Sequence, residues 1–243
     1  MKAMILAAGL GSRLKHKTAE RPKALVEVNG KPIIQYQLEN IIKADLDEVI
    51  IVVGYKKELI QDYVQKAFPA LKVIFLENKE YDTTNSSYSF WQAKELLHGH
   101  SYMHFNCDIV FSFDLLLQVL NSEYRNAIAV RKDLVLGDKM ENVVLHGDRI
   151  IKMSLKKTPE AVGKAFGLAK LSQESTGLIV KKLERYINNG DKNQNYFGMI
   201  REAVKELDYR AIITDKFNLQ EINTLTDYDA TKSILSENNF ASQ

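Results

Sequence analysis

Met4-Ile-Leu-Ala-Ala-Gly-Leu-Gly-Ser-Arg-Leu14 opens the chain, and Arg21-Pro-Lys-Ala-Leu25 follows shortly after it. The first stretch begins with an apolar run that has no helical period, which predicts a buried strand over Lys2–Ala7. Gly9 and Gly11 come next, and glycine lets backbone N–H groups approach an anion closely. Because ligands of open α/β folds bind beyond the carboxyl ends of the strands, we expect an anion to bind at this loop.

The spacing of these glycines excludes two common nucleotide-binding motifs. It is not the G-x-x-x-x-G-K-[ST] of a P-loop, and Leu14 stands where G-x-G-x-x-G would need its last glycine. Arg13 and Lys23 supply cations that could neutralise a triphosphate and the charge that develops at an attacked phosphorus. The alternative is that the glycines only form a tight turn and that both cations are solvated. The complete stretch argues against this alternative, because Pro22 also fixes the backbone before Lys23.

The bulk composition indicates which classes of protein to exclude. The chain has 243 residues, of which 45% are hydrophobic and 26% charged, as is typical of a globular protein. A net charge of +2 without a basic block does not suggest a nucleic-acid partner. No apolar run approaches the roughly 18 residues of a membrane helix, and the N-terminus does not read as a signal peptide. One cysteine excludes an internal disulfide, so we expect a cytoplasmic protein. We further expect a monomer or a homodimer.

Strands and helices alternate over the first part of the chain. This predicts an α/β fold with a Rossmann-like, mixed but mostly parallel central sheet and helices on both faces. The predicted strands are Lys2–Ala7, Glu48–Val53, Lys72–Leu76 and Tyr102–Cys107, and the predicted helices are Pro32–Ile42, Lys57–Phe68 and Ser87–Leu97.

The pattern changes after Asp108 and predicts a small β-rich subregion. The expected strands there are Ala127–Arg131, Asn142–His146, Arg149–Ser154, Phe166–Leu171, Ala211–Thr214 and Leu219–Ile222, and the expected helices are Thr176–Ile187, Tyr196–Leu207 and Thr226–Ser236. The polar segment Ser236–Gln243 is expected to fray. Without a linker or repeat, we expect a single domain over residues 1–243.

Three stretches together resemble the signature of the nucleotidyltransferase superfamily, which includes the sugar-nucleotide pyrophosphorylases. They are Leu6-Ala-Ala-Gly-Leu-Gly-Ser-Arg-Leu14, Arg21-Pro-Lys-Ala-Leu25 and Val28-Asn-Gly-Lys-Pro32. The similarity is dense over the first third of the chain and looser beyond it. The resemblance implies that Arg13 and Lys23 are the catalytic cations, and that residues 1–110 bind a nucleotide while 111–243 bind an acceptor. The implied nucleotide-binding residues of the loop are Leu6, Ala7, Ala8, Gly9, Gly11 and Ser12.

Asp108 ends a predicted buried strand and would face the same edge of the sheet as the glycine loop. Mg²⁺ prefers hard oxygen ligands and often takes one or two carboxylates plus substrate phosphates. The alternative is an Asp that caps a turn, but the resemblance implies a magnesium-binding Asp in such a motif. The family usually has a second Asp near the C-terminus, where this chain has Asn223. Asn223 could be a weaker ligand, Glu221 could take part, or one carboxylate could suffice, whereas Asp227 is expected to cap or start the last helix.

Asn85, Ser89 and Ala93 form a pattern similar to enzymes that transfer CMP to small phosphorylated alcohols or phosphonates, such as phosphocholine cytidylyltransferases. The Gly-Thr-Ala-type segment of many sugar-1-phosphate enzymes is missing from this stretch. Asn85 and Ser89 are therefore candidate nucleotide contacts at a helix N-terminus. The alternative is a plain capping cluster of Ser and Asn.

Four residues are candidates for the acceptor site. Tyr88 and Trp91 could attract a quaternary ammonium by cation–π interaction, although aromatic residues near a helix more often belong to a core. The resemblance implies a lysine that meets the acceptor's phosphate, for which Lys156 and Lys157 are the candidates. Adjacent lysines are also common in solvated loops.

The resemblance thus implies a Mg²⁺-dependent transfer of CMP from CTP to a small phosphate- or phosphonate-bearing acceptor, with release of pyrophosphate, for cell-surface decoration. The expected partners are CTP and a phosphocholine-like acceptor, with neither nucleic acid nor membrane. One alternative is a sugar-1-phosphate uridylyl- or guanylyltransferase. Another is a non-catalytic nucleotide-binding protein of the same fold, against which the joint presence of Arg13, Lys23 and Asp108 argues.

Overall fold

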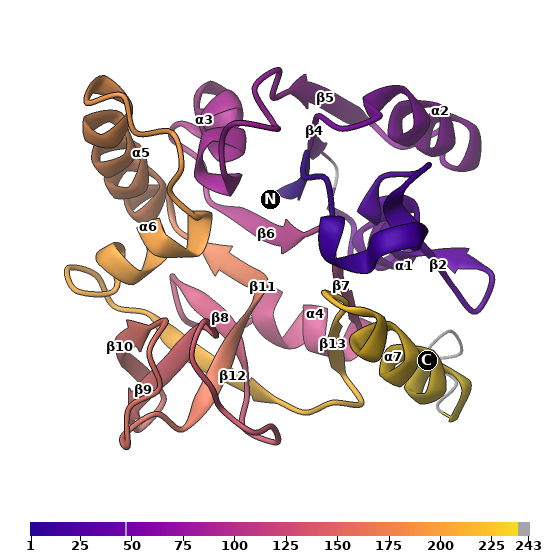
Figure 1. Cartoon of the computed structure of the whole chain (residues 1–243). Helices are drawn as coiled ribbons and strands as arrows, with labels where there is room; N and C mark the ends of the chain where they lie inside the picture. The colour runs from indigo at the N-terminus through magenta and orange to yellow at the C-terminus, as the bar shows by residue number, and fades with distance from the viewer. Residues whose placement is uncertain (47, 238–243) are drawn as a thin grey trace.

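The structure is a computed structural model and describes residues 1–46 and 48–237 (Figure 1). Its last described element is the helix α7, Leu225–Glu237. The fraying expected at Ser236–Gln243 concerns residues that, beyond Glu237, lie outside the described part of the chain.

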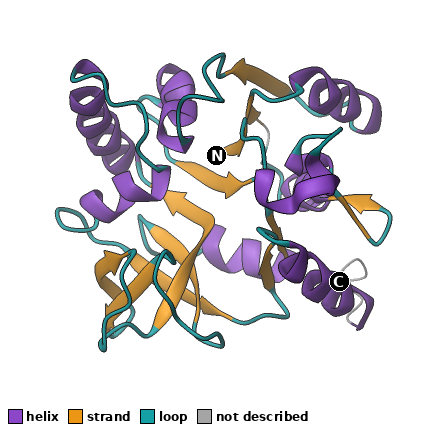
Figure 2. Cartoon of the chain, in the orientation of Figure 1, coloured by secondary structure: helices purple, strands orange, loops and turns teal. Residues whose placement is uncertain are grey.

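A mixed sheet of nine strands runs through the described residues in the order β5-β4-β1-β6-β11-β8-β12-β10-β9. Its strands are β1 Lys2–Ala7, β4 Glu48–Val53, β5 Val73–Glu77, β6 Tyr102–Asn106, β8 Ala127–Arg131, β9 Asn142–His146, β10 Arg149–Ser154, β11 Gly163–Leu171 and β12 Arg210–Thr214. Figure 2 draws the strands in orange. Two small ribbons pair β2 (Glu27–Val28) with β3 (Lys31–Pro32), and β7 (Ile109–Phe111) with β13 (Leu219–Glu221). The predicted mixed α/β fold is confirmed.

The parallel part of the sheet is the N-terminal part, where β5, β4, β1 and β6 are neighbours. Beyond β6 the sheet continues with β11, which runs antiparallel to both β6 and β8. Leu6 of β1 lies in register with Asn106 of β6. Because the two strands are parallel, the loop after β1 and the residues after Asn106 emerge side by side at one edge of the sheet.

Helices cover both faces of this sheet (Figure 1). The helices α3 (Ser86–Leu97), α5 (Gln173–Asn188) and α6 (Tyr196–Ala203) supply buried residues to the core on one face. The helices α1 (Ile33–Lys43), α2 (Lys57–Ala67) and α4 (Phe113–Leu120) supply the core on the other face. A third cluster, with Leu14, Val28 and Ile222 at its centre, joins the segment after the glycine loop to α7.

The differences from the predicted elements have local causes. The helix α4 was not predicted, because its eight residues, Phe-Asp-Leu-Leu-Leu-Gln-Val-Leu, form an almost continuous apolar run. The sequence signal for this helix is its cap, Ser112, whose Oγ accepts a hydrogen bond from Leu115 N–H. The strand β11 begins at Gly163, three residues before the expected start, since those residues pair with β8 and β9. The helix α6 ends at Ala203 and not at Leu207.

Gly167 in β11 leaves room for the side chain of Asn106 on the neighbouring strand, because a Cβ at Gly167 would overlap Cβ and Cγ of Asn106. We expect Gly167→Ala to lower the free energy of unfolding by about 1–3 kcal/mol, the usual range for overpacking. Denaturant titration would measure this loss. Gly177→Ala is the matched control, because Gly177 lies in α5 with open space around it and helical alanine is favoured over glycine. Equal stability of Gly167→Ala and the wild type would contradict the steric argument.

Candidate active site

The loop after β1 directs Arg13 toward the sheet edge. Gly11 has φ 65°, and a Cβ there would lie 3.0 Å from Lys23 Cβ, so both the backbone and the packing require glycine. The short 3₁₀ helix Ser12–Thr18 follows, and it is anchored by Leu14, which is fully buried. With Leu14 facing the core, the neighbouring Arg13 is exposed and reaches the cavity beside the loop.

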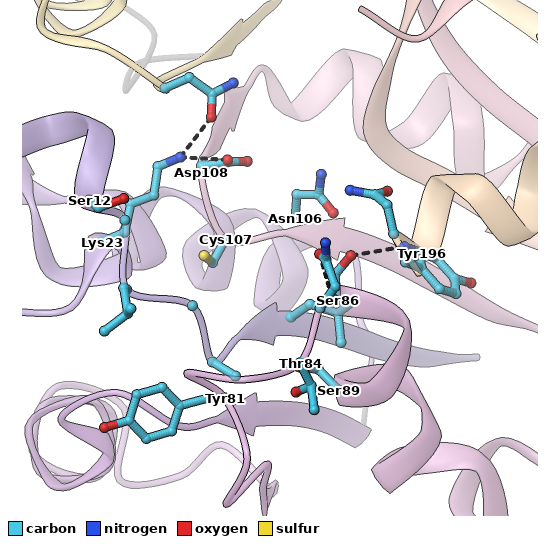
Figure 3. A pocket seen from close by; sticks show the side chains of 18 of the residues that line it. Ser12, Lys23, Tyr81, Thr84, Ser86, Ser89, Asn106, Cys107, Asp108 and Tyr196 are labelled. Carbon is cyan, nitrogen blue, oxygen red and sulfur yellow. Dashed lines mark hydrogen bonds and ion pairs between the residues drawn. The ribbon is translucent and has the colours of Figure 1, made fainter. Parts of the chain in front are cut away.

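A cluster of four polar residues forms at this edge, and Figure 3 shows two of them, Lys23 and Asp108, joined by an ion pair. The buried Lys23 places Nζ 2.6 Å from Asp108 Oδ2 and 3.0 Å from Asn223 Oδ1. Arg13 Nη2 lies 2.7 Å from the same Asn223 Oδ1. The fold thus brings together the two predicted cations, the predicted carboxylate after β6, and the residue that replaces a second Asp.

The donor atoms around Asp108 partly fit a divalent metal. Its Oδ1 is buried without a hydrogen-bond partner among the described residues, which leaves one carboxylate oxygen available as a ligand. Asn223 Oδ1 already accepts hydrogen bonds from two cations, and Glu221 Oε2 lies 2.5 Å from Lys164 Nζ. In residues 1–46 and 48–237, no three His, Cys, Asp or Glu side chains gather closely enough to hold a metal by themselves. Since Mg²⁺ usually takes one or two carboxylates and completes its shell with phosphates and water, Asp108 suits such a site.

Glu221 lies close enough to this cluster to be affected by its charges. Burial raises the pKa of the Glu221 carboxyl, and the negative charge of Asp108 raises it further, whereas Lys164 and Lys23 act in the opposite direction. The ion pair with Lys164 therefore favours the ionised carboxylate against the cost of its burial.

A cavity of about 460 Å³ opens over the glycine loop. It is lined by the predicted residues Leu6, Ala8, Gly9, Gly11, Ser12, Asn85 and Ser89, together with Arg13, Lys23 and Asp108. Ala7 is not part of this lining, because side chains alternate along a strand and that of Ala7 packs in the core on the opposite face. Tyr81 and Thr84, from the segment between β5 and α3, and Ser86, the first residue of α3, form a further part of the wall.

The segment before α3 has a capping role as well as a place in this cavity. Asn85 caps α3 by accepting a hydrogen bond from Ser86 N–H, and the buried Ser89 accepts one from Asn78 Nδ2. Ser86 Oγ accepts a hydrogen bond from the backbone N–H of Tyr196, which ties the N-terminus of α3 to that of α6 (Figure 3). The capping alternative therefore holds for Asn85, although its side chain still borders the cavity.

A second cavity, of about 610 Å³, adjoins the first. Both cavities are lined by Arg13, Asn106, Asp108, Asn195, Phe197 and Asn223, so Arg13 and the two residues that bind Lys23 lie where the cavities meet. The rest of the second lining includes Arg131, Lys139, Glu141, Lys164, Phe166 and Glu221. Most of these residues are polar or charged, as a phosphate-bearing ligand would require.

The predicted acceptor residues lie outside both linings. Tyr88 donates to Glu80 Oε1, and Trp91 packs at the margin of the core. Since Ser86 and Ser89 are on the cavity face of α3, residues 88 and 91 point to its other sides. Lys156 borders a different cavity and Lys157 is exposed.

Sequence reasoning missed Lys164 as a lysine of the second cavity. The sequence signal for Lys164 is the segment Gly163-Lys-Ala-Phe, which forms the start of β11. The prediction chose the adjacent lysines Lys156 and Lys157 instead. Arg131 was also missed, because only the pairing of β8 with β11 brings it to this edge, and Asn106 was missed although it lies two residues before the predicted Asp108. Among the described helices, none is both long and apolar enough to cross a membrane.

Comparisons with known proteins agree with this geometry. The chain is 32% identical to the choline-phosphate cytidylyltransferase of Streptococcus pneumoniae over 98% of its own length and 100% of the relative. It is 34% identical to the CTP:phosphoglutamine cytidylyltransferase of Campylobacter jejuni over 54% of this chain and 53% of that protein. The solved CTP:phosphocholine cytidylyltransferase of Streptococcus pneumoniae superposes with a TM-score of 0.77 at 26% identity, covering 96% and 98% of the two chains.

Residues 3–174 match the family model described as the MobA-like NTP transferase domain. This is more than half of the chain, and it contains the glycine loop, both cations and Asp108. The chain is therefore a nucleotidyltransferase that belongs to the MobA-like NTP transferase family.

Proposed function

We propose that this enzyme transfers CMP from CTP to a small acceptor that carries a phosphate or phosphonate, with release of pyrophosphate. The observation that carries the proposal is the convergence of Arg13 and Asp108 where the two cavities meet, with Lys23 on the wall of the first cavity bound to Asp108. One cavity is available for the nucleotide and the other for the acceptor, so the reacting phosphorus would lie beside the cations. The cytidylyltransferase names of the relatives support CTP as the nucleotide.

The proposed reaction needs no covalent enzyme intermediate. An oxygen of the acceptor's phosphate forms a bond to the α-phosphorus of CTP while the bond from that phosphorus to the bridging oxygen of the β-phosphate breaks. Pyrophosphate leaves with the bonding electron pair. Arg13 and Lys23 neutralise the charge on the phosphoryl oxygens, and the walls of the two cavities hold the reactants in line. We assign to Lys164 the contact with the acceptor's phosphate that was expected of Lys156 or Lys157.

Asp108 would hold Mg²⁺ through its unpartnered Oδ1. Glu221 is the candidate for a second ligand through Oε1, since only its Oε2 is in the ion pair with Lys164. The ion would supply positive charge to the phosphates. Asn223 is less suited to this role than the sequence suggested, because its amide oxygen is engaged by Arg13 and Lys23. We therefore propose that Asn223 orients the two cations.

The proposal keeps residues 1–243 as a single domain with a nucleotide-binding half, 1–110, and an acceptor-binding half, 111–243. Each cavity nevertheless draws residues from both halves: Asn195 and Asn223 border the first, and Arg13 and Asp108 border the second. We further propose that the enzyme works in the cytoplasm and that its CMP-linked product serves cell-surface decoration.

A panel of nucleoside triphosphates and acceptors, followed by pyrophosphate release, tests the proposal. We expect release with CTP, Mg²⁺ and phosphocholine or a similar phosphomonoester, and none when the acceptor is omitted. Release with UTP or GTP and a sugar 1-phosphate would favour the alternative of a sugar-1-phosphate nucleotidyltransferase. Absence of release in every combination would contradict the proposed function.

Asn223→Asp tests the role of the amide. A carboxylate at this position would neutralise part of the charge of Arg13 and Lys23 and would add a metal ligand. We expect the KM for CTP to rise about tenfold, the equivalent of one charge-assisted interaction, while half-maximal activity is reached at a lower Mg²⁺ concentration. Steady-state kinetics at varied CTP and Mg²⁺ would measure both. An unchanged KM for CTP would contradict the orienting role of Asn223.

A further inference from the structure

Asn106, the last residue of β6, borders both cavities where they meet. Figure 3 shows the side chain of Asn106 between Asp108 and Tyr196 in this view. Neither the cations nor the carboxylates of the proposed mechanism involve it. Asn106 is nevertheless held firmly, since it has a partner on its own strand and a glycine opposite it on β11.

The partner on its own strand is His104, which is completely buried. His104 Nε2 lies 2.9 Å from Asn106 Oδ1, and the imidazole also contacts Tyr196, with ring centroids 4.5 Å apart. The desolvation of the ring lowers the pKa of His104 to about 4, although the hydrogen bond with Asn106 opposes this effect. The imidazole is therefore neutral near pH 7 and carries one hydrogen.

The position of that hydrogen orients the Asn106 amide. A carbonyl oxygen can only accept a hydrogen bond, so Nε2 donates to Oδ1. The reverse orientation of the amide would place the hydrogen on His104 Nδ1, which is buried and has no partner among the described residues. An orphaned buried N–H is rare in native proteins, so the first arrangement is favoured.

With Oδ1 bound to His104, the NH₂ group of Asn106 is left as a pair of donors. No acceptor for Nδ2 exists among the residues that the structure describes, and the side chain lies at the shared wall of the two cavities. Gly167 keeps the place of the amide open from the β11 side, because any Cβ there would overlap it. The arrangement is a neutral donor that is oriented before a ligand arrives.

We infer that Asn106 donates a hydrogen bond from Nδ2 to a phosphoryl oxygen at the junction of the two cavities, and that His104 is a positioning residue for it. This inference rests on the proposed function for the place of the reacting phosphorus. The oxygen would belong either to the α-phosphate of the nucleotide or to the phosphate of the acceptor. A neutral donor suits this position because Arg13, Lys23 and Asp108 already supply the charges.

Asn106→Leu and Asn106→Asp test the contact. Leucine removes the donor without adding charge, whereas aspartate keeps the shape and can still accept from His104 Nε2, so it preserves the local fold. Titration calorimetry of each variant with CMP and with cytidine separates phosphate contacts from base and ribose contacts. If the α-phosphate is the ligand, both variants should bind CMP at least about tenfold more weakly and cytidine with unchanged affinity.

If the acceptor's phosphate is the ligand, the affinity for CMP stays constant, while the KM for the acceptor rises and kcat falls about 100-fold. Equal weakening of CMP and cytidine, or no change in binding and turnover, would overturn the inference. The calorimetry does not require turnover. Wild-type protein that binds CMP but releases no pyrophosphate would therefore count against the proposed function and not against the contact.

His104→Phe tests the positioning role. It removes the bond to Asn106 Oδ1 and keeps an aromatic ring against Tyr196 and Phe197. We expect lower kcat in the single variant and no further loss when it is combined with Asn106→Leu, since the two residues act as one unit. Additive losses in the double variant would show that His104 acts independently of Asn106.

Discussion

Arg13→Ala is expected to lower kcat by about 10²–10³-fold, the usual effect of removing one preorganised donor from a charge-stabilising site. Arg13 is exposed where the two cavities meet, and among the described residues its one hydrogen-bond partner is the neutral amide of Asn223. Its charge is therefore available to the phosphates as negative charge develops. The affinity for CTP should change much less than kcat, because Lys23 remains to bind the ground state.

Pyrophosphate release at saturating CTP measures kcat, and titration calorimetry with CTP measures the affinity for CTP. Arg13→Lys is informative as well, because it keeps the charge but loses the planar fork of the guanidinium. Arg125→Ala is the matched control, since Arg125 is an exposed arginine that lines neither cavity. Wild-type turnover in Arg13→Ala would remove Arg13 from the mechanism.

Asp108→Asn is expected to lower kcat by about 10³-fold, because a charge-stabilising metal contributes several kcal/mol to such reactions. The variant keeps the shape of the side chain but removes the charge that faces Lys23, and it replaces a carboxylate whose buried Oδ1 has no partner among the described residues. Unlike a defect in nucleotide binding alone, this loss should not be recovered at saturating CTP.

Turnover measured across a Mg²⁺ titration checks this prediction, and the variant should need more Mg²⁺ to reach its own maximum. Asp114→Asn, at the exposed start of α4, is the control for removal of one carboxylate. Lys23 loses its ion pair in Asp108→Asn, so thermal unfolding of the variant should be recorded alongside. Full activity in a folded variant at the usual Mg²⁺ concentration would refute the role of Asp108.

The part of the site that could be predicted is the part encoded by local spacing. Gly11, Arg13 and Lys23 lie in one short stretch, and Asp108 ends a buried strand. Parallel neighbouring strands then carry these residues to a common edge, as the register of Leu6 with Asn106 shows. Neither inference needed a contact between distant antiparallel strands.

The residues of the second cavity are brought together by pairing between strands that are distant in the sequence. The sequence therefore could not predict them. The place of Lys164 follows from β11, which lies antiparallel between β6 and β8, an arrangement that the order of the strands along the chain does not indicate. Tyr88 and Trp91 failed to reach a cavity for a different reason. Their helix was predicted, but a rotation of one or two residues about its axis decides which side chains line the site.

The contact between Arg13 and Asn223 joins residues that are 210 positions apart, and Lys23 is held by the same distant amide. Chains are synthesised from the N-terminus, and segments of a domain can begin to fold before the rest has emerged. A nascent chain that has formed its parallel strands would still lack the residue that orients both cations. The contacts that hold Arg13 and Lys23 at the sheet edge are therefore complete only after the chain has been synthesised through Asn223.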